Sequence, residues 1–240
     1  MNDKEIAKII LSCIDLTSLN SNDSLFKIES LVESAKTPYG DVAALCVYPK
    51  FIPALVNKTD INIATVINFP KGRDNVHKIK KDIASAITEG AVEVDVVFPY
   101  TDYLNKEYSK VDEFLMMIHS LNKDITSKVI LETSELGGLN KIIDATKLCL
   151  EAGAGFIKTS TGKASGGATP EIANVILETI ADYPKKAGFK ASGGVKTFEE
   201  ARRYVVLAQS IMGRDWVNSN NFRIGASSLL AEVIKCLSKI

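Results

Sequence analysis

Two lysines of this sequence stand where a lysine could act as a nucleophile. Lys158 and Lys190 each end an apolar run, and each is followed by a small, glycine-bearing turn. They are separated by roughly 30 residues, about the length of one strand-helix unit. In a parallel barrel this spacing would place two cations on neighbouring strands at the same mouth. A nearby positive charge lowers the pKa of a lysine, and a neutral lysine is a nucleophile, so the pair predicts Schiff-base chemistry.

Charged residues recur at a similar interval before this pair. Asp95, Lys128, Lys158 and Lys190 follow one another at steps of one strand-helix unit each. Glu93 and Asp95 alternate in an otherwise apolar run, so they would share one face of a strand. A carboxylate in a buried strand needs a partner, and lysines on neighbouring strands would supply it. A single lysine at a strand end is usually solvated, but the regular recurrence favours one common site.

Three further residues end the first two expected strands. Asp15 and Thr17 end the first, where they would either cap the following helix or contact a substrate. Cys46 ends the second, and we interpret it as a small buried residue beside the substrate rather than a nucleophile, because no histidine is placed to activate it. The two histidines, His77 and His119, do not have the spacing of metal ligands, so no metal site is expected.

Glycine-bearing turns after the last three expected strands predict a phosphate site. Glycines allow backbone N–H groups to approach an anion closely, and the start of a helix adds a favourable dipole. Barrel enzymes often bind phosphate at the last two of these loops. Ordinary tight turns are the alternative. The candidate contacts are Thr161, Gly162, Lys163, Gly193, Gly194, Gly225, Ser227 and Ser228.

The alternation of strands and helices predicts an α/β fold, a single (β/α)8 barrel over residues 1–240 with a short N-terminal helix. A doubly wound open sheet is the rival, but no GxGxxG follows the first strand. Helix starts are expected at Thr169, which precedes Pro170, and at Thr197. Strands are expected at 12–16, 42–47, 61–67, 93–98, 128–132, 155–158, 187–190 and 222–225.

The overall composition narrows the class of protein. The 29 basic residues balance the 29 acidic ones, so neither nucleic-acid nor anionic-membrane binding is expected. The four cysteines are scattered without a CxxC, and no apolar run approaches the ~20 residues that span a bilayer. These features are typical of a cytoplasmic protein with reduced thiols.

Taken together, these motifs resemble the deoxyribose-phosphate aldolases, a family of class I aldolases. The similarity runs from Asp15 to about the last helix, and the motifs occur in the family's order. The stretches that carry it are DLTSLN (15–20), TVINFP (65–70), EVDVVFPY (93–100), FIKTSTGK (156–163), GFKASGG (188–194) and FRIGASS (222–228).

The resemblance implies a reversible cleavage of 2-deoxy-D-ribose 5-phosphate to acetaldehyde and D-glyceraldehyde 3-phosphate, as in deoxyribose phosphate catabolism. Lys158 matches the family's Schiff-base lysine, and Lys190 matches the lysine that lowers its pKa. Asp95 matches the proton-relay carboxylate, which acts with an ordered water. Lys128 matches a lysine that accompanies it, and we expect Lys128 to contact the substrate. The glycine-bearing loops match the phosphate site. The resemblance implies no metal or organic cofactor, and by analogy it suggests a homodimer.

Two positions depart from the family pattern. Lys196 stands where an arginine is common, which keeps the charge but loses bidentate contact with phosphate. The sequence stops at Ile240 without the C-terminal tyrosine of some members, so truncation of Ile240 is expected to leave activity nearly intact. Two rival functions are another Schiff-base aldolase and a non-catalytic sugar-phosphate sensor. The set of Asp95, Lys158 and Lys190 argues against the sensor, which has no need of a lysine with a lowered pKa.

Overall fold

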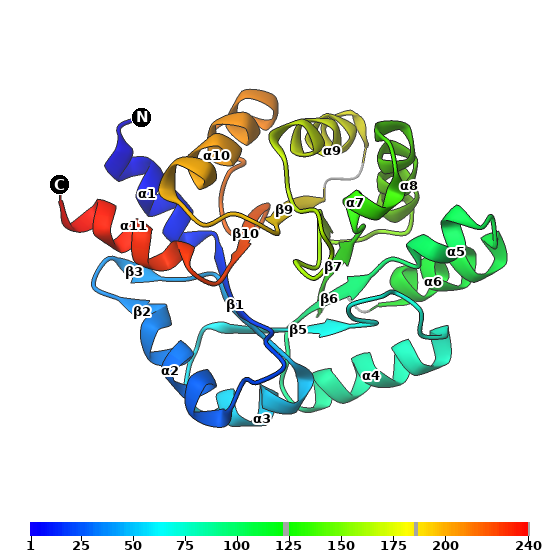
Figure 1. Ribbon diagram of the computed structural model, residues 1–240, viewed down its shortest axis with the longest axis horizontal. Coiled ribbons are helices and arrows are strands. Elements are labelled where there is room, and N and C mark those ends of the chain that lie inside the picture. The colour runs from blue at the N-terminus through cyan, green and yellow to red at the C-terminus, as the bar shows by residue number, and fades with distance from the viewer. Residues whose placement is uncertain (122–124, 185–186, 240) are drawn as a thin grey trace.

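Across the described residues (1–121, 125–184 and 187–239), the computed structural model contains a closed barrel of eight parallel strands (Figure 1). Their order around the barrel is β1-β10-β9-β8-β7-β6-β5-β4, so chain neighbours pair and the last strand closes on the first. This confirms the predicted (β/α)8 barrel and excludes the open sheet. The strands are β1 (Ile14–Ser18), β4 (Ala44–Val47), β5 (Asn62–Ile67), β6 (Glu93–Val97), β7 (Thr126–Ile130), β8 (Phe156–Lys158), β9 (Gly188–Ser192) and β10 (Phe222–Ala226).

The helices surround the barrel, and α1 lies against α10 and α11 near both chain ends (Figure 1). Every helix of the described residues is too short or too polar to cross a lipid bilayer. The α-helices are α1 (Asp3–Ser12), α2 (Leu25–Ala35), α3 (Ile52–Leu55), α4 (Val76–Thr88), α5 (Tyr100–Leu104), α6 (Tyr108–Ser120), α7 (Thr133–Leu136), α8 (Leu139–Glu151), α9 (Pro170–Asp182), α10 (Phe198–Met212) and α11 (Leu229–Ser238).

Local sequence signals account for several helix ends. The Thr169 side chain caps α9 with Pro170 in the first turn, and Thr197 and Glu200 form a reciprocal capping box at α10.

One predicted strand start was wrong: Lys128 was expected to open its strand, but it lies in the middle of β7, which begins at Thr126. Ile240, the site of the truncation prediction, lies outside the described residues.

Three features were not expected from the sequence: a helix, a hairpin and a 3-10 turn. α2 begins at Leu25 after the N-cap Ser24, and its first two residues are exposed, which obscures the apolar periodicity of a buried helix face. A short hairpin, β2 (Lys36–Thr37) and β3 (Gly40–Asp41), lies outside the barrel. A 3-10 turn, η1 (Pro49–Phe51), follows β4.

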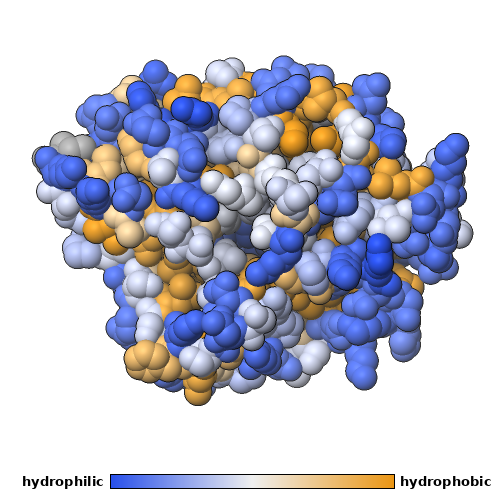
Figure 2. All heavy atoms as spheres, viewed as in Figure 1, coloured by the Kyte–Doolittle hydropathy of each residue, from blue (hydrophilic) through white to orange (hydrophobic). Residues whose placement is uncertain are grey.

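The inside of the barrel is divided between small and long side chains. Small apolar residues of β4 and β5 form an interior cluster, which includes Ala44, Cys46, Ala64 and Val66. Long charged side chains enter from β6 to β10 on the other side. The small residues leave the space that those chains need, because protein interiors are close-packed. Viewed in the same direction, the outer surface is mostly hydrophilic, with hydrophobic side chains in separate patches (Figure 2).

Candidate active site

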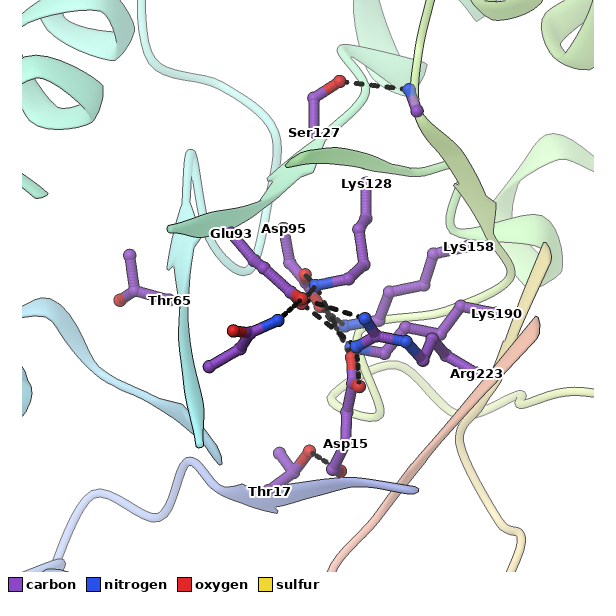
Figure 3. A network of polar contacts seen from close by, with 12 residues as sticks. Asp15, Thr17, Thr65, Glu93, Asp95, Ser127, Lys128, Lys158, Lys190 and Arg223 are labelled. Carbon is purple, nitrogen blue, oxygen red and sulfur yellow. Dashed lines mark hydrogen bonds and ion pairs between the residues drawn. The ribbon is translucent and has the colours of Figure 1, made fainter. Parts of the chain in front are cut away.

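Lys158 and Lys190 meet at one carboxylate oxygen inside the barrel (Figure 3). Each Nζ donates to Oδ2 of Asp95 at 2.7 Å. Lys158 is 3% exposed, and Lys190 and Asp95 are 0% exposed. The two lysines occupy paired positions on β8 and β9, because their spacing of one strand-helix unit brings equivalent strand positions together. The predicted proximity of these three residues is therefore present in the structure.

Lys128 holds the other oxygen of the same carboxylate. Its Nζ donates to Asp95 Oδ1 at 2.9 Å and lies 2.5 Å from Glu93 Oε2. Asp95 and Lys128 are register partners on β6 and β7. Glu93 and Asp95 point to the same interior face because they are alternate residues of one strand. Three lysines thus share Asp95 in the buried interior of the barrel.

A fourth cation, Arg223 of β10, extends this cluster. Its Nη1 donates to Asp15 at 2.6 Å, and its Nη2 donates to Glu93 at 2.9 Å. The guanidinium also lies 5.6 Å from the ring centre of Phe156. Sequence reasoning missed Arg223, although a signal was present: it stands between Phe222 and Ile224 in a buried strand, where an ionised side chain needs partners.

The environment separates the pKa of Lys158 from those of the other cations. Burial lowers the pKa of Lys158, and the positive charge of Lys190 lowers it further, although Asp95 opposes both effects. Burial also acts against the ammonium forms of Lys128 and Lys190, but their carboxylate partners outweigh it and raise both pKa values. Burial would raise the pKa of Asp95, yet the three lysines hold it well below its usual value. Among the cluster's three lysines, Lys158 is therefore the one that loses its proton most readily.

Asp15 is not a helix cap, which corrects one of its two predicted roles. Its carboxylate contacts Lys190 and Arg223 inside the barrel and is 0% exposed. The side chain that caps α2 is that of Ser24, which accepts from the Lys27 amide. Thr17 caps no helix either, because its hydroxyl donates to the Asp15 carbonyl at 2.8 Å.

Cys46 is fully buried, as expected of a small interior residue. Burial and the charge of Asp95 raise the pKa of its thiol, although the three lysines act in the opposite direction. A thiol with a raised pKa is a poor nucleophile. Cys46 packs beside the charged cluster without lining the adjoining cavity.

A cavity of about 250 Å³ opens at Lys158. It brings together most of the expected substrate contacts, but Asp15, Cys46, Lys128 and Ser228 do not line it. Ser228 lies beside α11 and lines a different surface hollow. Sequence reasoning did not single out Asn20 as a contact here. The lining comprises Thr17, Leu19, Asn20, Lys158, Thr161, Gly162, Lys163, Ser192, Gly193, Gly194, Val195, Lys196, Gly225, Ala226 and Ser227.

Two cavity glycines are required by their surroundings. Gly193 has a φ of +88°, and a Cβ added there would lie 2.9 Å from the Gly167 Cα. A Cβ on Gly225 would lie 3.0 Å from Cε of Lys190 and would clash with the Ser192 hydroxyl. These positions therefore keep the backbone of the cavity wall exposed, as an anion-binding loop requires.

Glu132 is a buried acid that the sequence interpretation did not single out. It follows β7 in a left-handed conformation, with a φ of +52°, and is 1% exposed. Thr161 donates to its carboxylate through both its hydroxyl and its amide. Burial raises the pKa of Glu132 despite these hydrogen bonds. The contact fixes the loop that carries Gly162 and Lys163 toward the cavity.

Clusters of three or more His, Cys, Asp or Glu side chains suited to a metal ion are absent from the described ranges. The carboxylates of the barrel are instead engaged by lysine and arginine. The arrangement is that of an amine nucleophile with a lowered pKa, a carboxylate beside it, and a glycine-walled cavity that carries additional lysines.

Comparison with known proteins agrees with this chemistry. A model of the DeoC/LacD family aldolases matches residues 9–235. A deoxyribose phosphate aldolase from Aeropyrum pernix, described as a tetramer, has a TM-score of 0.78 at 25% identity. The match covers 99% of this chain and 92% of the Aeropyrum pernix chain. A candidate deoxyribose-phosphate aldolase from Coccidioides immitis has a TM-score of 0.84 at 28% identity, covering 98% and 87%.

A candidate enzyme of the same kind from Toxoplasma gondii ME49 has a TM-score of 0.89 at 19% identity and covers 98% of this chain and 95% of its own. At that identity the likeness concerns the fold alone. The family match spans most of the chain and includes every strand of the barrel. From this match, and from the lysine cluster that the barrel encloses, we conclude that the chain belongs to the DeoC/LacD aldolase family.

Proposed function

We propose that this aldolase cleaves 2-deoxy-D-ribose 5-phosphate to acetaldehyde and D-glyceraldehyde 3-phosphate through an imine on Lys158. The observation that carries the proposal is the position of Lys158. It lines the cavity, its pKa is lowered, and its Nζ lies 2.7 Å from Asp95 Oδ2. The named relatives from Aeropyrum pernix and Coccidioides immitis support this substrate over other aldols.

The cavity has a basic end suited to a phosphate. Lys163 and Lys196 line it, together with the backbone of Gly193 and Gly194. Ser227 stands just before α11, so an anion there would also benefit from the helix dipole. A phosphate held at this end would direct the aldehyde of the open-chain sugar toward Lys158. Binding energy from this remote group would position the reacting carbon.

The reaction then follows from the residues around the aldehyde. Neutral Lys158 attacks C1, and loss of water gives a protonated imine that acts as an electron sink. The C3 hydroxyl loses its proton to a water held by Asp95, and the C3–C4 bond breaks to release glyceraldehyde 3-phosphate. The bonding electrons move into an enamine on the two-carbon fragment. Protonation of the enamine and hydrolysis of the imine release acetaldehyde and restore Lys158.

Lys190 and Lys128 have supporting roles in this scheme. Lys190 lowers the pKa of Lys158 through its positive charge, and Lys128 keeps the Asp95 carboxylate ionised and oriented. Thr17 contacts the substrate where it lines the cavity. Asp15 and Cys46 do not touch the substrate in this scheme, because neither residue lines the cavity. The carboxylate of Asp15 is instead engaged by Lys190 and Arg223.

The test is turnover of 2-deoxy-D-ribose 5-phosphate with identification of both products. Lys158→Ala should lose on the order of 10³-fold or more in kcat/KM, whereas Lys147→Ala, on the exposed face of α8, should not. Cleavage of other aldols in preference to this one would favour the rival aldolase. Binding of the sugar phosphate without turnover would favour the sensor.

A homo-oligomer stays a prediction for this chain. We propose a dimer by analogy with the family, and the Aeropyrum pernix relative is described as a tetramer. Light scattering at the working concentration measures the mass directly. A mass of a single chain would contradict the proposal.

A further inference from the structure

The buried cluster contains more cations than anions. Its carboxylates are Asp15, Glu93 and Asp95, and each of them contacts at least two basic groups. Its basic groups are Lys128, Lys158, Lys190 and Arg223. If all seven were ionised, the cluster would keep one uncompensated positive charge away from water. Such a charge is costly, so one of the four bases should be neutral.

Arg223 is the base that cannot be the neutral one, because a guanidinium does not deprotonate in proteins. It also occupies two carboxylates at once, with Nη1 2.6 Å from Asp15 and Nη2 2.9 Å from Glu93. Lys128 and Lys190 each contact two or more carboxylates, whereas Lys158 contacts Asp95 alone. Among the described contacts, Lys158 is therefore the least compensated base.

Building on the imine mechanism proposed above, we infer that Arg223 is a positioning residue that keeps Lys158 uncharged. By binding Asp15 and Glu93, it gives the cluster one base more than it has carboxylates, and Lys158 is the base that gives up its proton. Arg223 acts without touching Lys158 or lining the cavity. Without Arg223, three lysines would face three carboxylates, and Lys158 could remain an ammonium ion.

Carboxylates shared between the basic groups explain how Arg223 can affect Lys158 without touching it. Arg223 shares Asp15 with Lys190 and shares Glu93 with Lys128. If Arg223 were removed, these two lysines would be drawn toward Asp15 and Glu93. Asp95 would then be less occupied and free to stabilise the ammonium form of Lys158. The raised pKa values of Lys128 and Lys190 and the lowered pKa of Lys158 agree with this distribution of protons.

The remaining groups near Lys158 do not change the count. Cys46 faces it from β4 as a buried thiol with a raised pKa, so it is neutral. Glu132 lies beyond the end of β7, where Thr161 donates to its carboxylate. Burial raises its pKa although the Thr161 hydrogen bonds and the charge of Lys158 oppose the shift, so its neutral form is favoured more than in a free side chain. β5 contains no titratable residue, and its Asn62 donates to Glu93 at 3.0 Å.

The experiment measures the protonation of Lys158 separately from turnover. Each variant is treated briefly with acetaldehyde and cyanoborohydride across a range of pH, and ethylation of Lys158 is quantified by peptide mass spectrometry. Ethylation of the exposed Lys147 in the same digest serves as the internal reference. The midpoint of Lys158 ethylation against pH is the quantity compared, because a loss of packing alone would reduce its extent without moving its midpoint.

Arg223→Met should raise this midpoint, since a unit charge roughly 10 Å away at an effective dielectric of about 20 shifts a pKa by about one unit. Ethylation at neutral pH should then fall about tenfold. Arg223→Lys keeps the charge and should keep the wild-type midpoint. Glu93→Gln removes an anion and should lower the midpoint. The double variant, Arg223→Met with Glu93→Gln, again has one base more than it has carboxylates. Its midpoint should return toward the wild-type value.

Folding of each variant is checked by circular dichroism. An unchanged midpoint in folded Arg223→Met would overturn the inference. If Arg223→Met does not fold, the comparison is between Glu93→Gln and the double variant, and equal midpoints in those two would overturn it. Wild-type protein that is not ethylated at Lys158 at any pH would refute the proposed function itself. Wild-type protein that is ethylated at Lys158, with midpoints that do not move in the variants, would refute only the role of Arg223.

Discussion

Replacement of Lys190 by methionine should raise the pKa of Lys158 by about two units. The Nζ atoms of both lysines lie 2.7 Å from the same oxygen of Asp95, so they can be no farther apart than twice that distance. Two unit charges roughly 5 Å apart repel by about 3 kcal/mol at an effective dielectric of about 20, which corresponds to roughly two pKa units. Methionine has a similar length but no charge, so it removes this repulsion with little change in volume.

The assay is the pH dependence of kcat/KM for cleavage of 2-deoxy-D-ribose 5-phosphate, which reports the pKa of the essential base in the free enzyme. In Lys190→Met, the acidic limb of the kcat/KM profile should move to higher pH by about two pH units. Activity near neutral pH should then fall about 100-fold. Much of that loss should be recovered at higher pH. Lys190→Arg keeps a positive charge, so its acidic limb should stay near that of the wild type. A Lys190→Met enzyme with an unshifted acidic limb would refute the electrostatic reasoning.

Three other perturbations test the phosphate loops and the charged cluster. Lys163→Met should raise KM for the phosphorylated sugar about tenfold, as expected for one charge-assisted contact; an equal effect on unphosphorylated deoxyribose would contradict the assignment. Gly193→Ala should weaken substrate binding because its Cβ would approach Gly167, whereas Gly137→Ala has a similar positive φ but open space and should leave KM unchanged; equal KM values in both variants would count against the steric argument. Because the pKa of Asp95 lies below its ordinary value of 3.8 in the fold, its stabilising effect is present above that pH and is lost as the pH falls below it. Denaturant unfolding should therefore give a free energy about 1 kcal/mol lower at pH 3 than at pH 5 from Asp95 alone, and equal values would show that the cluster does not depend on ionised carboxylates.

The central residues were predictable because they depend on two regularities. Alternation along a strand places Glu93 and Asp95 on one face, and one residue per strand-helix unit places Lys128, Lys158 and Lys190 on successive strands. Both follow from backbone geometry, which a barrel preserves. Arg223 continues the same series, one further strand-helix unit beyond Lys190, but the sequence interpretation treated it only as part of a glycine-bearing stretch.

Other features depend on contacts that local sequence does not encode. Asp15 is joined to Lys190 and Arg223 only when β1 pairs with β10, a closure that brings together opposite ends of the chain. From the sequence alone, a carboxylate at a strand end is equally compatible with a helix cap. Ser227 and Ser228 are adjacent and chemically identical, and only the course of the turn after β10 decides that Ser227 lines the cavity.

The most direct test of the account is the identity of the lysine that forms the imine. The protein is mixed with acetaldehyde, reduced with borohydride, and mapped by peptide mass spectrometry. The account predicts an ethyl group on Lys158 that is absent from Lys158→Ala and weaker in Lys190→Ala, with Lys128 and Lys190 unmodified. Folded protein that carries no adduct at Lys158, or that carries it at Lys190 instead, would contradict the central claim.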